Sequence, residues 1–199
     1  MKKLAILLAL GALLWCGLLY EDSRQLKDGI IRLHVVANSD SEEDQKTKLQ
    51  VRDAITGALE QAMGKLPDSR AAKAWLEAKL PELERLANDT LAALGCSERA
   101  VVSLKKESFP VRKYDTFTLP SGVYESLRVV IGSGEGENWW CVVFPRLCLS
   151  ATSKDFEAAA AGAGFSEPMA STLAGEQGYE LRFFLLDLLG KLENFFHGN

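Results

Sequence analysis

The chain has 199 residues, of which 47% are hydrophobic and 25% are charged, so it is long enough for one domain with a buried core. Its 23 basic and 27 acidic residues give a net charge of −4. No basic stripe interleaved with aromatic side chains is visible, so nucleic acid is not an expected partner.

The first twenty residues have the pattern of an export signal. Lys2 and Lys3 precede Leu4–Tyr20, a run of 17 residues without a charge. As a helix this run is roughly 25 Å long, at the short end for spanning a bilayer. The two lysines favour the cytoplasmic side, so the rest of the chain is expected outside the membrane. A core helix is the less favoured alternative, because the run has no polar face.

The run does not decide between a cleaved signal peptide and a retained signal anchor. No A-x-A cleavage pattern follows it. We expect residues 1–20 to be the signal or anchor, residues 21–29 to be a polar connector, and residues 30–199 to form a single domain.

The domain begins with a predicted strand, a polar corner and a helix. Apolar residues at alternate positions of Ile30–Ala37 are typical of a strand. Ser41 is the expected helix cap, and the acidic residues 42–44 fill the first turn, where the helix dipole favours negative charge. Apolar residues then recur at spacings of three and four as far as Leu66. The acidic cluster is explained as a helix start, and its spacing does not match a calcium loop.

A second helical pattern follows, with Asp68 or Ser69 as its cap and Gly95 as its end. Pro81 interrupts this pattern and predicts a kink or two separate helices. The alternating or apolar stretches Ala100–Phe109, 125–132 and 138–145 predict strands, and the glycine-rich loop between the last two predicts a hairpin.

The C-terminal part of the chain is less regular. Residues 150–176 contain an Ala/Gly-rich stretch that predicts weak structure, and Tyr179–Phe196 predicts a helix. The whole pattern indicates an α+β domain, in which two early helices and a C-terminal helix pack on a mostly antiparallel sheet, after the N-terminal apolar export or anchor segment.

His34 is the one candidate for acid–base chemistry within a predicted strand. Asp40 or Asp44 could orient it and Cys96 could serve as a nucleophile, but nothing in the local sequence brings these groups together. A histidine with a structural hydrogen bond is the favoured interpretation. We therefore predict no catalytic residue, no metal, no cofactor and no small-molecule substrate. The loop "GSGEGEN" also lacks the G-K-[ST] ending of a phosphate-binding loop.

Two further features concern the predicted strand at 138–145. Trp139 and Trp140 are adjacent, so they point to opposite faces, and one of them is a candidate contact for a partner. Cys141 and Cys148 are separated by "VVFPRL" and are close enough for a disulfide in an exported domain. The alternative is that these two cysteines and Cys96 are buried thiols.

Three blocks of the sequence resemble one protein family. These blocks are "IRLHVVANSDSEEDQKTKLQVRDAI", "FPVRKY" and "LPSGVYESLRVVIGSGEGENWWCVVFPRLC". In their content and order, and in the apolar N-terminus, they are similar to the stage II sporulation protein R family over roughly residues 1–150. The C-terminal "LRFFLLDLL" matches more loosely.

The resemblance implies a signal rather than a catalyst. Such a protein is made in the forespore of an endospore-forming bacterium and exported into the space between forespore and mother cell. It activates a membrane-embedded aspartic protease, which removes the pro-sequence of the sigma-E factor in the mother cell. The resemblance carries no catalytic residues, and the matched blocks offer these candidates for partner contact: Arg32, His34, Asn38, Ser39, Asp40, Trp139 and Trp140.

Two other functions remain open at the level of the sequence. One is a cell-envelope hydrolase that uses His34 with an acidic partner. The other is a wall- or lipid-anchored binding module that uses an exposed tryptophan.

Overall fold

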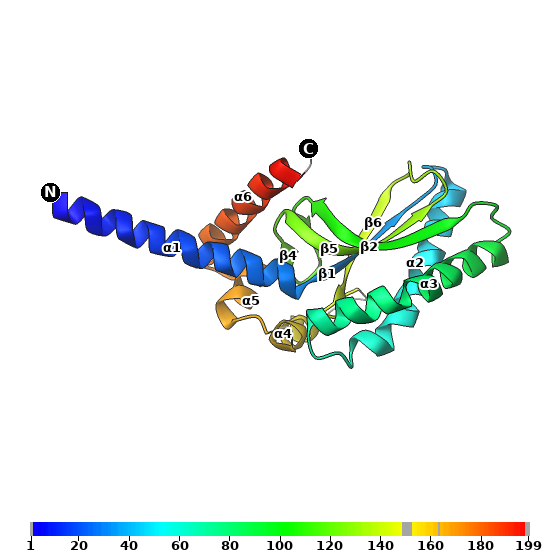
Figure 1. The fold of residues 1–199 in the computed structure, drawn as a ribbon, viewed down its shortest axis with the longest axis horizontal. Coiled ribbons are helices and arrows are strands. Elements are labelled where there is room, and N and C mark those ends of the chain that lie inside the picture. The colour runs from blue at the N-terminus through cyan, green and yellow to red at the C-terminus, as the bar shows by residue number, and fades with distance from the viewer. Residues whose placement is uncertain (1, 149–152, 163, 198–199) are drawn as a thin grey trace.

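The fold is built around a four-stranded sheet with helices on both sides, as the computed structural model in Figure 1 shows for residues 2–148, 153–162 and 164–197. The strands of this sheet stand in the order β2-β5-β1-β6. The strands are β1 (Ile31–Val36), β2 (Ala100–Phe109), β3 (Arg112–Lys113), β4 (Thr118–Leu119), β5 (Gly122–Ile131) and β6 (Asn138–Phe144). The helices are α1 (Lys2–Gly29), α2 (Glu42–Met63), α3 (Ser69–Ala93), α4 (Ser153–Gly162), α5 (Glu167–Ala174) and α6 (Glu180–His197).

The sheet is mostly antiparallel, as predicted, but the predicted hairpin is wrong. β5 pairs with β2 in antiparallel and with β1 in parallel orientation, and β6 pairs antiparallel with β1. β1 therefore lies between β5 and β6, and the glycine-rich loop at 132–137 crosses the end of β1 instead of closing a hairpin. The prediction failed because a short glycine-rich loop is compatible with both arrangements, while the burial of β1 on both faces suits a central strand.

Each face of the sheet carries its own core. Leu33 and Val35 of β1 face α2 and α3, which cover one side. Arg32 and His34 point to the other side, where the end of α1, the small β3–β4 sheet and helices α4, α5 and α6 surround a second apolar cluster. The alternation predicted for the first strand is thus confirmed.

The predicted helix caps are confirmed as well. The side chain of Ser41 accepts a hydrogen bond from the Asp44 backbone N–H, and Asp68 does the same for Ala71. α3 is one helix that runs through Pro81, so the two-helix alternative is wrong. Pro81 is exposed, so the carbonyl that loses its helical hydrogen bond can be hydrated.

The N-terminal segment differs from the expected connector. Residues 21–29 are helical and continue the apolar run as part of α1. Leu19 and Leu26 are buried against the domain, whereas the apolar residues before them are mostly exposed. By length and composition α1 is able to cross a membrane, with a mean hydropathy of 2.0 over its most apolar window.

The stretch 150–176 is more regular than expected where it is described. It contains α4 and α5, while residues 149–152 and 163 lie outside the described part of the chain. The predicted C-terminal helix is confirmed as α6.

α6 is fixed to the start of β5 by a short polar contact. The carboxylate of Asp187 accepts hydrogen bonds from the Ser121 backbone N–H at 2.9 Å and from its hydroxyl at 2.6 Å. Burial acts to raise the pKa of Asp187, but the hydrogen bonds from Lys191 and Ser121 lower it below its usual value. Gly190 lies so close to the Ser121 carbonyl that a methyl group there would overlap the oxygen.

This close approach predicts opposite effects for two glycine substitutions. Gly190→Ala should separate α6 from β5 and destabilise the protein by about 2 kcal/mol. The control Gly57→Ala, in the exposed middle of α2 with open space around it, should be neutral or stabilising by up to about 1 kcal/mol. Thermal unfolding measures both, and hydrogen exchange at Ser121 reports the loss of the contact. Equal midpoints for the two variants would contradict the packing described.

Candidate functional site

The polar corner after β1 is a docking place for the loop at 132–137. The side-chain oxygen of Asn38 accepts a hydrogen bond from the Ser133 backbone N–H at 2.9 Å, and the Ser133 hydroxyl donates to the Asn38 carbonyl at 2.7 Å. Asp40 accepts from the Glu137 backbone N–H at 2.7 Å. A loop that crosses the end of a strand has no neighbouring strand to pair with, so its backbone N–H groups need other acceptors. The side chains of Asn38 and Asp40 supply them.

The same corner is tied to the start of α2. Asp44 accepts hydrogen bonds from the Asn38 amide at 3.0 Å and from the Ser39 hydroxyl at 2.5 Å. These hydrogen bonds lower the pKa of Asp44 below its usual value, with Ser39 as the main cause. On the loop side, a methyl group at Gly136 would overlap the Ser39 carbonyl, so only glycine permits this approach. Asn38, Ser39 and Asp40 therefore have structural roles, and of the three only Asp40 is exposed.

A second polar group lies on the sheet face opposite α2 and α3. His34 is hydrogen-bonded through Nδ1 to Glu107 at 3.2 Å and through Nε2 to the side-chain oxygen of Asn138 at 2.7 Å. Arg128 is within 3.3 Å of the same glutamate. The side chains of His34 and Glu107 are each 13% exposed. We call these four residues, His34, Glu107, Arg128 and Asn138, the sheet-face cluster.

The charges within the sheet-face cluster compensate one another. Burial acts to raise the pKa of Glu107, but the hydrogen bond with His34 and the charge of Arg128 bring it below its usual value. Glu107 is therefore a carboxylate at neutral pH, held between two cationic or hydrogen-bonding partners. A buried charge with such partners is a stable structural unit.

The residues proposed to work with His34 do not reach it. Asp40 and Asp44 are engaged at the corner, and the Cys96 thiol lies beside Glu98. Burial raises the pKa of Cys96, which makes it a weaker nucleophile at neutral pH. Within the described residues, no group of three His, Cys, Asp or Glu side chains is arranged to hold a metal.

Trp139 and Trp140 point to opposite faces, as predicted. The Arg52 guanidinium of α2 lies 4.2 Å from the centre of the Trp139 ring. Trp140 lies near His34, with their ring centres 5.8 Å apart, and Arg112 covers it at 5.2 Å. Both tryptophans are half-buried, and an arginine lies over each ring.

Arg32 is fully buried and lies among aromatic rings. Its guanidinium is 3.9 Å from the centre of the Phe109 ring and donates a hydrogen bond to the Tyr114 hydroxyl at 3.0 Å. Among the described residues no carboxylate forms an ion pair with it. Because Arg32 has no exposed surface, a partner cannot touch it unless the covering residues move away.

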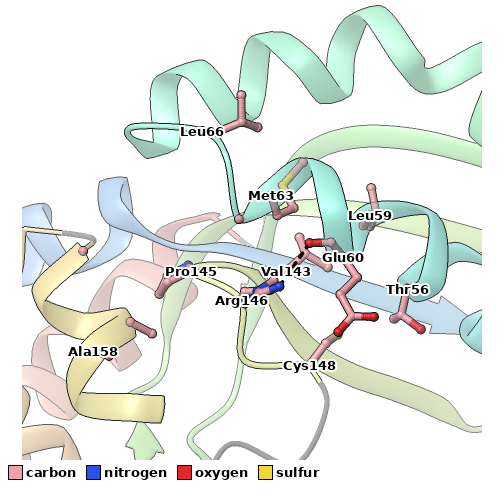
Figure 2. Close-up of a pocket in the computed structure, with 13 residues that line it drawn as sticks. Thr56, Leu59, Glu60, Met63, Leu66, Val143, Pro145, Arg146, Cys148 and Ala158 are labelled. Atoms are coloured by element: carbon pink, nitrogen blue, oxygen red, sulfur yellow. Dashed lines mark hydrogen bonds between the residues drawn. The ribbon is translucent and has the colours of Figure 1, made fainter. Parts of the chain in front are cut away.

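A cavity of about 420 Å³ lies apart from the sheet-face cluster, between the end of α2, the turn after β6 and α4 (Figure 2). Its wall includes Met63, Val143 and Cys148, and Arg146 at its rim donates to the Glu60 carbonyl at 3.4 Å. Cys148 and Cys141 have their sulfur atoms at bonding distance, with Cα atoms 5.1 Å apart, a separation that suits a disulfide.

Sequence reasoning missed Glu107 and Arg128. They are distant from His34 in the chain and reach it only because β2 and β5 lie beside β1. β2 also contains Lys105 and Lys106, and β5 also contains Glu125, so the charge of Glu107 or Arg128 did not distinguish either residue from its neighbours.

The sheet-face cluster predicts a pH-dependent contribution to stability. The pKa of Glu107 is lower in the folded than in the unfolded chain, so its carboxylate stabilises the fold above the ordinary value of 4.5, and this effect is lost as the pH falls through the folded pKa. Glu107→Gln should therefore lower the free energy of unfolding by about 1 kcal/mol at pH 7 and by less at pH 3. Urea unfolding in mild detergent measures this free energy at both pH values. An equal decrease at pH 7 and pH 3 would contradict the stabilising role assigned to the Glu107 carboxylate.

The disulfide has a direct chemical test. Trypsin cuts after Arg146, between the two cysteines, so a bridge between Cys141 and Cys148 joins two tryptic peptides that separate only on reduction. Mass spectrometry of the protein, purified after secretion into an oxidising compartment and digested without reduction, should find the joined pair. Two separate peptides, each alkylated at its thiol, would show that the bridge is not formed.

Comparison with known proteins identifies the family. The model of the family described as stage II sporulation protein R matches residues 27–154. The stage II sporulation protein R of Bacillus subtilis (strain 168) is 36% identical over 162 residues, which cover 74% of this chain and 71% of that protein. No solved structure matches the chain. The matched residues include the corner, the sheet-face cluster and both tryptophans, and the chain belongs to the stage II sporulation protein R family.

Proposed function

We propose that this protein is an exported signal of sporulation that activates a membrane-embedded aspartic protease and so leads to processing of the pro-sigma-E factor in the mother cell. The observation that carries the proposal is the family match over most of the domain, together with an apolar N-terminal helix suited to export or anchoring. The protein acts in the space between forespore and mother cell, either released or held in the membrane through residues 4–20.

The sheet face around His34 is the surface we propose for contact with the protease. The contacts of α1 and α6 with β5 concentrate at residues 121–123, so they leave the other end of this face open. Val101 there is 60% exposed, and on the same strand Lys105 lies beside Glu107 of the sheet-face cluster. An uncovered sheet face with a polar group, an exposed valine and a half-buried tryptophan suits a protein partner.

Co-expression in a host that does not sporulate tests the activity. The chain, its cognate protease and the sigma precursor are produced together, and the cleaved fraction of the precursor is measured by immunoblot. We expect cleavage only when all three are present. Precursor that stays intact although the chain is exported would refute the proposal.

Two matched lysines test the contact surface. Lys105 on the open face and Lys79 on α3 have similarly exposed side chains, 47% and 41%, and each lies near a glutamate. Lys105→Glu should reduce precursor cleavage several-fold because it reverses a charge within the proposed contact, while Lys79→Glu should leave it unchanged. Equal cleavage with both variants places the contact elsewhere on the protein.

One observation favours a second candidate function, a cell-envelope hydrolase. His34 does contact an acidic residue, Glu107, which is the arrangement that a general base needs. His34→Gln discriminates between the two functions, since it removes the base but retains a hydrogen-bonding side chain. Precursor cleavage that survives this change in a folded protein rules out His34 as the base of an essential reaction.

A further inference from the structure

α6 carries apolar residues on two opposite faces. Its inner face, with Leu186 and Gly190, is buried against the domain. Its outer face presents side chains at spacings of three and four residues, each at least 43% exposed. These outer residues are Leu181, Phe184, Leu188, Leu192 and Phe195, with Phe196 beside them. A continuous apolar stripe of this size on an exposed helix indicates a surface that is covered in the working protein.

The flank of α6 is joined to α1 just beyond the apolar run. Arg182 forms an ion pair with Asp22 at 2.6 Å, and Glu193 forms one with Lys27. Asp22 is two residues after the end of the run Leu4–Tyr20. The first turn of α6 is therefore at the level where α1 would leave a bilayer.

The two ion pairs also show how α6 is inclined. Between them α6 advances 193 − 182 = 11 residues, while α1 advances 27 − 22 = 5. At about 1.5 Å per residue, the distance between the two ion pairs is therefore roughly twice as long along α6 as along α1. Parallel helices would have equal distances, so α6 crosses α1 obliquely. Figure 1 shows α6 rising at an angle from α1. A helix so inclined to a membrane-crossing helix lies closer to the membrane plane than to its normal.

The outer face of α6 is turned toward the side on which α1 leaves the domain. α1 runs from the domain past the flank of α6 and outward (Figure 1). The inner face of α6 points to the domain at Ser121, so its outer face points away from the domain. α1 also leads away from the domain (Figure 1). A bilayer around that run would meet the stripe from this side.

We infer that α6 lies on the surface of the bilayer that α1 crosses, with its outer apolar residues in the boundary between lipid headgroups and acyl chains. Amphipathic helices bind membranes in this way, with the apolar face buried about 5–10 Å deep. The inference rests on α1 as a retained anchor, which is part of the proposed function. If a second copy of the chain or another protein covered the stripe, the stripe would not need to lie near Asp22 or to face the direction in which α1 runs.

Depth-dependent fluorescence quenching tests the inference. The full chain, with Cys16→Ser and Cys96→Ser, is labelled with an environment-sensitive fluorophore at one introduced cysteine and reconstituted into phosphatidylcholine–phosphatidylglycerol vesicles. Leu188→Cys and Leu192→Cys report the outer face of α6. Leu94→Cys, 41% exposed at the end of α3, is the matched control, and Leu10→Cys reports insertion of α1. A chain without an introduced cysteine gives the background.

We expect a spin label near the lipid headgroups to quench the fluorophores at 188 and 192 several-fold more strongly than the one at 94. A deeper spin label should quench the fluorophore at 10. Equal quenching at 188, 192 and 94 while position 10 is quenched overturns the inference and leaves the anchor intact. Fluorophores at 188 and 192 that are shielded from water but not quenched by lipid show a protein–protein contact, which also overturns it. No quenching at 10 contradicts both the anchor and the inference, and none of these outcomes depends on the protease.

Discussion

The central position of β1 is the constraint on which the rest of the structure depends. Because β1 lies between β5 and β6, the connection from β5 to β6 must cross the end of β1. The backbone N–H groups of that crossing loop need acceptors, and the corner supplies them through Asn38 and Asp40. The same residues lead into α2, so one polar corner fixes the sheet order and the start of the helix that covers the first core.

β1 also separates two faces of the sheet that differ in how completely they are covered. Leu33 and Val35 lie in the core beneath α2 and α3, which cover their face of the sheet. On the other face, Arg32 fills the part enclosed by aromatic rings, and His34 lies two residues further along, toward the open part. One strand thus packs against a closed core on one face and passes from a closed to an open part on the other, and its period of two residues separates the two faces. This open part is the surface that we propose for contact with a protein partner.

Much of the secondary structure could be predicted from the sequence, but the order of the strands and the contacts between them could not. Ser41 and Asp68 were recognisable as caps, because a cap is decided by residues within one helical turn. The position of β1 between β5 and β6 was not, since periodicity shows which face a residue takes but not which strand lies beside it. The contact between His34 and Glu107 depends on that strand order, so it was equally hidden. The helical state of residues 21–29 was missed because polarity alone does not distinguish a connector from a docked amphipathic helix.

The uninterrupted α1 has a mechanical consequence for an anchored signal. A flexible linker of nine residues in place of 21–29 would have a root-mean-square end-to-end distance of roughly 15–18 Å, so the domain could move over that distance from the membrane segment and rotate freely. A helix packed through Leu26 has no such freedom, so tilt and rotation of the segment in the bilayer pass directly to the sheet. A protein anchored as we propose would therefore have a short, fixed reach. It would present one surface at one height, and a receptor in a facing membrane could be engaged only where the two membranes are closely apposed.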